Sequence, residues 1–177
     1  SGGGIFILGS KLYINQNNRG KVTVYNNSAV LGGNIYLESS TLIATRTATS
    51  TEKHFEVRNG SAHEFGGGLA CVGSTVEMDD VLVVDNKAIL DGGGIYGVLC
   101  LFKAQSTSIV RNNAGGNGGG LFFQSISNVA LENVLITQNF AGAAGGGLAA
   151  IRARLFFMST SIVSLNNANE GGGLHLD

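Results

Sequence analysis

The chain has 177 residues, of which 28 are glycine, none is proline or tryptophan, and only 13% carry a charge. Its net charge of −1 offers no basic face of the kind that nucleic acid requires, so we expect no nucleic-acid partner. No apolar run approaches the ~20 residues of a membrane-spanning helix, so no membrane span is expected in this segment. The glycines recur in register, which excludes a flexible low-complexity tract.

A glycine cluster followed at once by Ile or Leu recurs seven times along the chain. Successive clusters begin 30, 34, 26, 26, 27 and 26 residues apart. The aliphatic residues that follow them are Ile5, Ile35, Leu69, Ile95, Leu121, Leu148 and Leu174. A fixed period of this length is the signature of a repeat protein, whose copies stack on one another. We therefore expect residues 1–177 to form one solenoid segment, and we interpret the chain as a piece of a longer solenoid.

Strand signals follow the glycines within the repeats. In chain order, two-residue alternation of apolar side chains marks residues 22–24, 76–78 and 151–155, and β-branched runs mark 81–84 and 162–163. A repeat of ~26 residues holds three short strands and three turns, but not a strand, a full helix and two loops. The pattern predicts an all-β, single-stranded parallel β-helix of about six to seven coils, stacked at the inter-strand spacing of ~4.8 Å.

Stacked coils would align equivalent residues in columns. The seven aliphatic residues after the glycines are expected to form a dry interior ladder, and burial of each should contribute ~1.5–3 kcal/mol. An Asn recurs just before the glycine clusters, three residues after an aliphatic residue, and we expect these side chains to hydrogen-bond from coil to coil. The members of this structural Asn ladder are Asn27, Asn86, Asn112, Asn139 and Asn166, and Gly60 stands in the Asn place of one repeat.

An intermittent aromatic stripe lies one position after the aliphatic ladder. It consists of Phe6, Tyr36, Tyr96 and Phe122. If this column faces water, it is a candidate partner-binding stripe, because exposed apolar patches often mark interaction sites. The alternatives are a second element that covers the column, or plain β-strand propensity.

The longest repeat carries a Thr-rich insertion around residues 38–54. Thr45, Thr47, Thr49 and Thr51 alternate along it. An ice-binding surface would need such a row in coil after coil, whereas this row occurs once. We therefore expect a strand or loop that bulges from the rod, as insertions in repeat proteins often do on a binding face.

The residues capable of chemistry are scattered. Enzymes of the β-helix type need several carboxylates that converge on one face. Asp79 and Asp80 form the only adjacent acidic pair, with Asp85 and Asp91 in the same repeat, and we interpret them as solvated turns. The histidines, which are His54, His63 and His175, lie in distant repeats without metal-ligand spacing. We expect no catalytic residue, metal or cofactor, and keep a polysaccharide lyase or hydrolase as an alternative.

The two cysteines, Cys71 and Cys100, fall at different places in their repeats. We expect buried free thiols, with a bridge between neighbouring turns as the alternative, so the redox compartment stays open. Two tripeptides, Asn26-Asn27-Ser28 and Asn59-Gly60-Ser61, match the acceptor sequence for N-glycosylation.

The paired motif, an aliphatic residue, two spacers and Asn followed by the glycine cluster and Ile or Leu, resembles the repeat of chlamydial polymorphic outer-membrane proteins. This resemblance covers nearly the whole chain. It implies a right-handed parallel β-helix in a secreted or surface-displayed passenger, which is commonly adhesive.

We therefore expect a non-catalytic extracellular or cell-surface rod that presents binding surfaces to a host or neighbouring surface protein or to a glycan. The first alternative is a structural subunit that self-associates into an extracellular fibre or appendage. The second alternative is the polysaccharide-acting enzyme.

Overall fold

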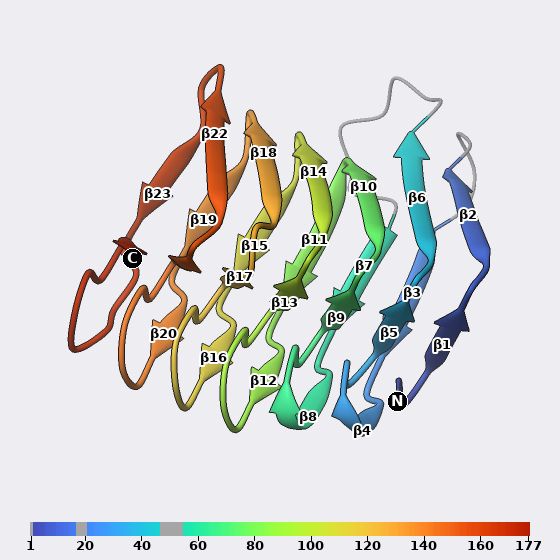
Figure 1. Ribbon diagram of the computed structural model, residues 1–177, viewed down its shortest axis with the longest axis horizontal. Coiled ribbons are helices and arrows are strands. Elements are labelled where there is room, and N and C mark those ends of the chain that lie inside the picture. Colours follow the sequence, from blue (N-terminus) through green and yellow to red (C-terminus); the bar gives the residue numbers. More distant parts are fainter. Residues whose placement is uncertain (1, 17–20, 47–54) are drawn as a thin grey trace.

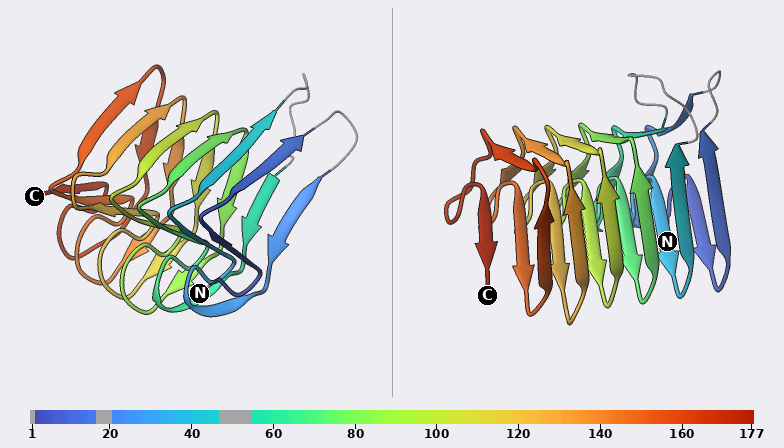
Figure 2. Two further views of the ribbon diagram at one scale, coloured as in Figure 1. Left: turned by 45° about the vertical axis from the view of Figure 1, so that its right-hand side comes forward. Right: turned by 90° about the horizontal axis from the view of Figure 1, so that it is seen from above.

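The computed structural model describes residues 2–16, 21–46 and 55–177, which form a parallel β-solenoid and no helix (Figure 1). Each winding of the chain adds a strand to each of up to four parallel sheets, so residues one winding apart face each other. Leu121, for example, lies between Ile95 and Leu148. The coils follow one another along a rod, with the first and last coils at opposite ends (Figure 2). This is the all-β parallel fold that the repeat period predicted.

We name the four sheets A to D in the order in which one coil visits them. Sheet A contains β1 (Ile5–Leu8), β5 (Ile35–Glu38), β9 (Leu69–Val72), β13 (Ile95–Val98), β17 (Leu121–Gln124), β21 (Leu148–Ile151) and β24 (Leu174–Leu176). Sheet B contains β2 (Lys11–Gln16), β6 (Thr41–Arg46), β10 (Thr75–Asp79), β14 (Leu101–Gln105), β18 (Asn128–Glu132) and β22 (Arg154–Met158). Sheet C contains β3 (Val22–Tyr25), β7 (Phe55–Arg58), β11 (Val81–Val84), β15 (Ser108–Val110), β19 (Leu135–Thr137) and β23 (Ile162–Ser164). Sheet D contains β4 (Ser28–Leu31), β8 (Ser61–Phe65), β12 (Lys87–Ala88), β16 (Asn113–Ala114) and β20 (Phe140–Ala141).

Sheet D is a fourth strand position, where the sequence predicted three per coil. Its pairing is short in the later coils, where β12 meets β16 only through Lys87 with Asn113 and Ala88 with Ala114. Two paired residues leave no visible alternation in the sequence, which is why this strand was not expected.

The interior ladder lies along sheet A. Ile35, Leu69, Ile95, Leu121 and Leu148 are paired in register from coil to coil and have no solvent exposure. Ile5 is half-buried, and Leu174 is 38% exposed. Complete burial of one such side chain contributes ~1.5–3 kcal/mol, so this column is a principal source of stability.

The glycine corners lie directly over the outer face of sheet A. A Cβ on Gly92, whose φ is +67°, would be 2.8 Å from the Cβ of Tyr96. Tyr36, Tyr96 and Phe122 are consequently buried, with exposed fractions of 7%, 7% and 2%, and Phe65 of β8 stacks on Tyr96 at a centroid distance of 4.5 Å. The sequence left open whether this candidate partner-binding stripe is exposed or covered, and the structure shows the covered alternative: of its four members Phe6 alone is exposed, because glycine backbone and sheet D cover the others.

The Asn column forms a continuous hydrogen-bonded ladder. The side-chain nitrogen of Asn112 donates to Oδ1 of Asn139 at 3.0 Å and to the carbonyl of Val83 at 3.1 Å. Its own Oδ1 accepts from the backbone N–H and the side-chain amide of Asn86 at 3.0 and 2.9 Å. Asn139 repeats the pattern toward Asn166. Every polar atom of the Asn112 side chain is paired, so its burial carries little desolvation penalty.

The two cysteines form a disulfide, with their Cα atoms 6.4 Å apart, which corrects the expectation of free thiols. Cys71 points into the interior from β9, and Cys100 lies at the corner after β13, one coil later. Gly97 faces Cys71 in register, and a Cβ there would collide with the ring of Phe123 but would be in ordinary contact with the Cys100 Cβ at 3.6 Å, so this glycine makes room for Phe123 of the next coil. The sequence did not predict this disulfide because the two cysteines occupy different positions in their repeats. The stacking of coils nevertheless brings them together.

The second half of the Thr-rich insertion, residues 47–54, lies outside the described residues. Thr45 lies on β6 and is half-buried. Thr47, Thr49, Thr51 and His54 lie outside the described residues.

Candidate functional site

The outer face of sheet B is open to solvent, unlike that of sheet A. Along β14, Phe102 and Ala104 point into the core, whereas Leu101 and Lys103 are exposed. This alternation follows from the two-residue period of a strand. The outward positions of sheet B are therefore available to a partner along the rod.

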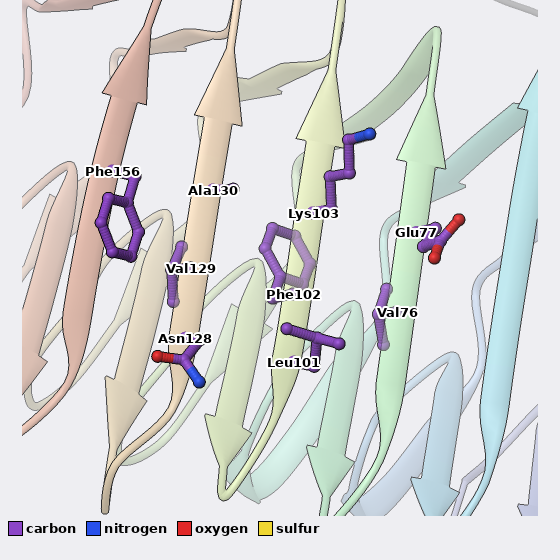
Figure 3. Close-up of a pocket in the computed structure, with 9 residues that line it drawn as sticks. All are labelled: Val76, Glu77, Leu101, Phe102, Lys103, Asn128, Val129, Ala130 and Phe156. Atoms are coloured by element: carbon purple, nitrogen blue, oxygen red, sulfur yellow. The ribbon is translucent and has the colours of Figure 1, made fainter.

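A shallow hollow of about 240 Å³ lies on this face over β10, β14, β18 and β22 (Figure 3). Ala130 stands in register between Lys103 of β14 and Phe156 of β22. Its small side chain leaves space between two large neighbours, and Leu101 and Asn128 border the hollow on one side. The hollow has the dimensions and lining to accept one apolar side chain or a single ring.

The corner that leads into sheet B carries two aliphatic side chains in an unusual backbone conformation. Leu99 has a φ of +55° and is 58% exposed, and Ile126 has a φ of +61° and is 69% exposed. Left-handed backbone is unfavourable for bulky residues and especially for β-branched ones. Other coils place at this corner Gly9, Ser39, Gly73 and Arg152. Folding therefore does not require an aliphatic residue here.

Ile126 is also an added residue. One coil joins Val98 to Leu101 through two residues, whereas the next joins Gln124 to Asn128 through three. The insertion accounts for the single 27-residue step in the glycine register. Insertions and strained backbone in repeat proteins concentrate at functional faces. We call the exposed set Leu99, Leu101, Ile126 and Phe156 the corner patch.

Charged side chains lie beside the corner patch, at the same level along the strands as Phe156. Glu77 and Lys103 face each other in register on β10 and β14. A second, smaller hollow of about 110 Å³ is lined by Thr45, Asp79, Lys103 and Gln105 among others. The site is thus apolar around Leu99, Leu101 and Ile126 and carries both signs of charge in the cross-strand row that contains Phe156.

The four aspartates singled out in the sequence lie on different parts of the coil. Asp79 is on the outer face of sheet B, and Asp80 is buried in the next corner. Asp85 forms an ion pair with Arg111 at 2.8 Å. The pKa of the Arg111 guanidinium is raised, chiefly by its hydrogen bonds to Asp85 and secondly by the negative charge of Asp85. Asp91 accepts hydrogen bonds from the backbone and side chain of Asn117. The carboxylates therefore do not converge in one groove.

The described histidines, His63 and His175, lie on strands that hold none of these four aspartates. His63 is exposed on β8, and His175 lies on β24 beside a hollow with Asn117 and Glu170. Among the described residues, no group of three or more His, Cys, Asp or Glu side chains is arranged to hold a metal ion. Because the described part of the chain contains no helix, it offers none that could cross a membrane.

Comparison of the chain with protein-family models, with curated proteins and with solved structures found no match. The structure confirms the parallel β-solenoid that the resemblance to the polymorphic outer-membrane repeat implied, and no family model links the chain to that family.

The sequence alone did not single out the corner patch. Two signals for it were present: a step of 27 residues where the neighbouring steps are 26, which marks the added residue Ile126, and an aliphatic residue, Leu99, where other repeats have Gly, Ser or Arg. Neither is interpretable without the register that shows which positions form the corner.

Proposed function

We propose that this chain is a rigid segment of an extracellular or cell-surface protein that binds a partner protein through the corner patch. The observation that carries the proposal is the pair Leu99 and Ile126, which are exposed and held at positive φ where the fold does not need them. Exposed apolar patches of this kind mark interaction sites.

The shape and charge of the site favour a protein ligand. The hollow beside Phe156 fits an apolar side chain, and Glu77 and Lys103 lie at its border, where a polar rim would surround it. An apolar centre with a polar rim is the usual arrangement of a protein interface. The rod supplies a pre-organised scaffold, so little ordering free energy is lost on binding.

The disulfide supports an extracellular location. Disulfides form and persist in oxidising compartments, whereas cytosolic thiols are kept reduced. The Cys71–Cys100 bridge is buried between successive coils, where it stabilises the stack itself.

A bead-adhesion experiment tests the proposal. Beads coated with the purified chain are added to a panel of cell monolayers, untreated or treated with protease or with glycosidases. We expect the beads to bind untreated cells, and this binding to be lost after protease but kept after glycosidase treatment. The variant L99S/I126S/F156S should bind at least about tenfold less, because truncation of central apolar contacts typically costs more than 1 kcal/mol.

Tyr13→Ser is the matched control, since Tyr13 is also an exposed aromatic residue of sheet B, on β2 and outside the corner patch. It should bind as the parent chain does. Equal binding by the triple variant would refute the corner patch, and loss of binding with glycosidase alone would show a glycan ligand. Sedimentation at increasing concentration detects binding to a second copy of the chain, which would also replace the proposed partner.

A further inference from the structure

Two exposed asparagines lie in neighbouring coils at the corner between sheets C and D. Asn26 follows β3 and Asn59 follows β7, directly after the paired residues Tyr25 and Arg58. Both asparagines have positive φ, +56° and +51°, and both are exposed. An exposed serine, Ser28 or Ser61, stands two residues after each of them, at the start of sheet D. Both corners therefore present Asn-x-Ser to solvent.

The side-chain amides of these asparagines are available. The backbone N–H of Asn26 donates to the carbonyl of Arg58 at 3.3 Å, and that of Asn59 donates to the carbonyl of Val84 at 3.2 Å. These bonds fix the corner backbone without using the side chains. The Asn ladder next to Asn26 uses Asn27 instead. Within the described part of the chain, neither corner side chain takes part in a hydrogen bond.

The fold does not dictate this tripeptide. At the same corner, other coils carry Asp85, Arg111, Gln138 and Leu165, all at positive φ. Two residues later they carry Lys87, Asn113, Phe140 and Asn167. Neither Asn at the corner nor Ser after it is needed for the turn, yet the two coincide in both coils.

We infer that Asn26 and Asn59 are acceptor sites for N-linked glycans. The Asn-x-Ser/Thr sequence at a surface loop of a secreted protein is the general acceptor for this modification. The disulfide indicates passage through an oxidising compartment, which is where such transfer takes place. The inference depends on secretion and does not depend on the corner patch.

The transfer requires a lipid-linked oligosaccharide diphosphate and a transferase. The Asn side-chain nitrogen loses one proton to a base and forms a bond to the anomeric carbon of the glycan. The bond from that carbon to the diphosphate oxygen breaks, and the lipid diphosphate leaves with the electron pair. The glycans would then lie at the corner between sheets C and D, while the corner patch lies between sheets A and B.

Secretion of the chain, with a leader peptide supplied, from a eukaryotic cell line tests the inference. We expect the secreted chain to lose mass on treatment with an enzyme that removes N-linked glycans. In heavy-oxygen water, this enzyme should convert Asn26 and Asn59 to labelled Asp, which peptide mass spectrometry detects. The variant S28A/S61A keeps both asparagines and should lose the modification.

A gain-of-site variant keeps the test independent of any loss of folding. D85N/K87S places the same tripeptide at the equivalent corner of the next coil and should add a glycan at position 85. Folded, secreted chain with unmodified Asn26 and Asn59, alongside a modified glycoprotein control from the same cells, would overturn the inference. Glycans that persist in S28A/S61A would also overturn it.

Discussion

The side-chain amide of Asn34 occupies the place in the Asn ladder that Gly60 leaves empty. Its nitrogen donates to the carbonyl of Arg58 at 2.9 Å and to Oδ1 of Asn86 at 3.3 Å, and its Oδ1 accepts from the side chain of Asn27 at 3.0 Å. Asn34 stands in the third position of a glycine cluster, where regular coils have Gly. The two departures from the repeat therefore compensate each other through space, although 26 residues separate them.

The exchange of these residues is testable as a double-mutant cycle. Asn34→Gly should lower the free energy of unfolding by about 1–3 kcal/mol, because it leaves buried partners unsatisfied. Gly60→Asn alone should also destabilise, because a Cβ there meets the side chain of Asn34 at 2.6 Å and also the Gly67 carbonyl oxygen. N34G/G60N recreates the regular repeat, in which the ladder Asn coexists with a third-position glycine.

We therefore expect a favourable coupling energy of about 1–3 kcal/mol between positions 34 and 60, measured by chemical denaturation. Strictly additive losses would mean that the two residues do not substitute for each other.

The disulfide should hold the third and fourth coils together. It closes a loop with a sequence separation of 29 residues, and the chain-entropy model gives about 3–4 kcal/mol for a loop of this size. The variant C71A/C100S should unfold at correspondingly lower denaturant, and reductant should shift the parent chain but leave the variant unchanged. Serine is the natural replacement, since Ser74 and Ser127 occupy the equivalent corner of neighbouring coils. A parent chain indifferent to reductant would contradict the bridge.

A charge in the interior ladder should abolish folding. Leu121→Asp would place an unpaired carboxylate where the side chain has no solvent exposure, and its desolvation exceeds the stability of a typical domain. Leu101→Asp is the matched control, because Leu101 is 54% exposed on the outer face of sheet B. Circular dichroism and thermal melting should show an unfolded first variant and a cooperatively melting second one. Cooperative melting of both would show that the ladder is misassigned.

We expect that glycine is required at the corners before sheet A mainly because a side chain there would collide with its neighbours, and less because the backbone has positive φ. Gly92 and Gly73 both have positive φ, but a Cβ on Gly92 would be 2.8 Å from the Tyr96 Cβ, whereas nothing lies within 4 Å of one on Gly73. Gly73→Ala should cost about 1–2 kcal/mol from backbone strain. Gly92→Ala adds overpacking and should cost about 1–3 kcal/mol more. Equal losses in denaturation experiments would remove the packing argument.

Two covered tyrosines should make the fold sensitive to alkali. Desolvation raises the pKa of Tyr36 above 10.0, with the nearby Glu38 adding to the effect, and burial also raises the pKa of Tyr96 despite its hydrogen bond from Gln124. Because the folded state retains these protons longer than the unfolded chain, stability is full below pH 10 and falls as the pH rises through the folded-state pKa values. Urea denaturation at increasing pH should show a shallower decline for Y36F/Y96F. Parallel pH profiles would indicate that other groups cause the alkaline loss.

The sequence by itself determined the architecture. Glycine clusters 26 to 34 residues apart, an aliphatic residue after each and an Asn before five of the seven specify a stacked coil. Equivalent residues can pack on or hydrogen-bond to one another only when successive coils lie in register. We could therefore predict the ladder that contains Ile95 and Leu121 and the ladder that contains Asn86 and Asn112, because the same residue type recurs at the same position of successive repeats.

Tertiary structure decided everything that breaks the repeat. The disulfide depends on the stacking of coils, which brings Cys100 at the corner of one coil close to Cys71 of the coil before it, and the burial of Tyr96 depends on the path of the Gly92 corner. The exposure of Leu99 and Ile126 depends on which positions form the corner. Each of these is a relation between residues of different coils or sheets, so periodicity along one chain does not contain it. Contacts between coils, and not spacing along the sequence, determine which residues that depart from the repeat interact with each other. They also determine which side chains stay exposed to a partner.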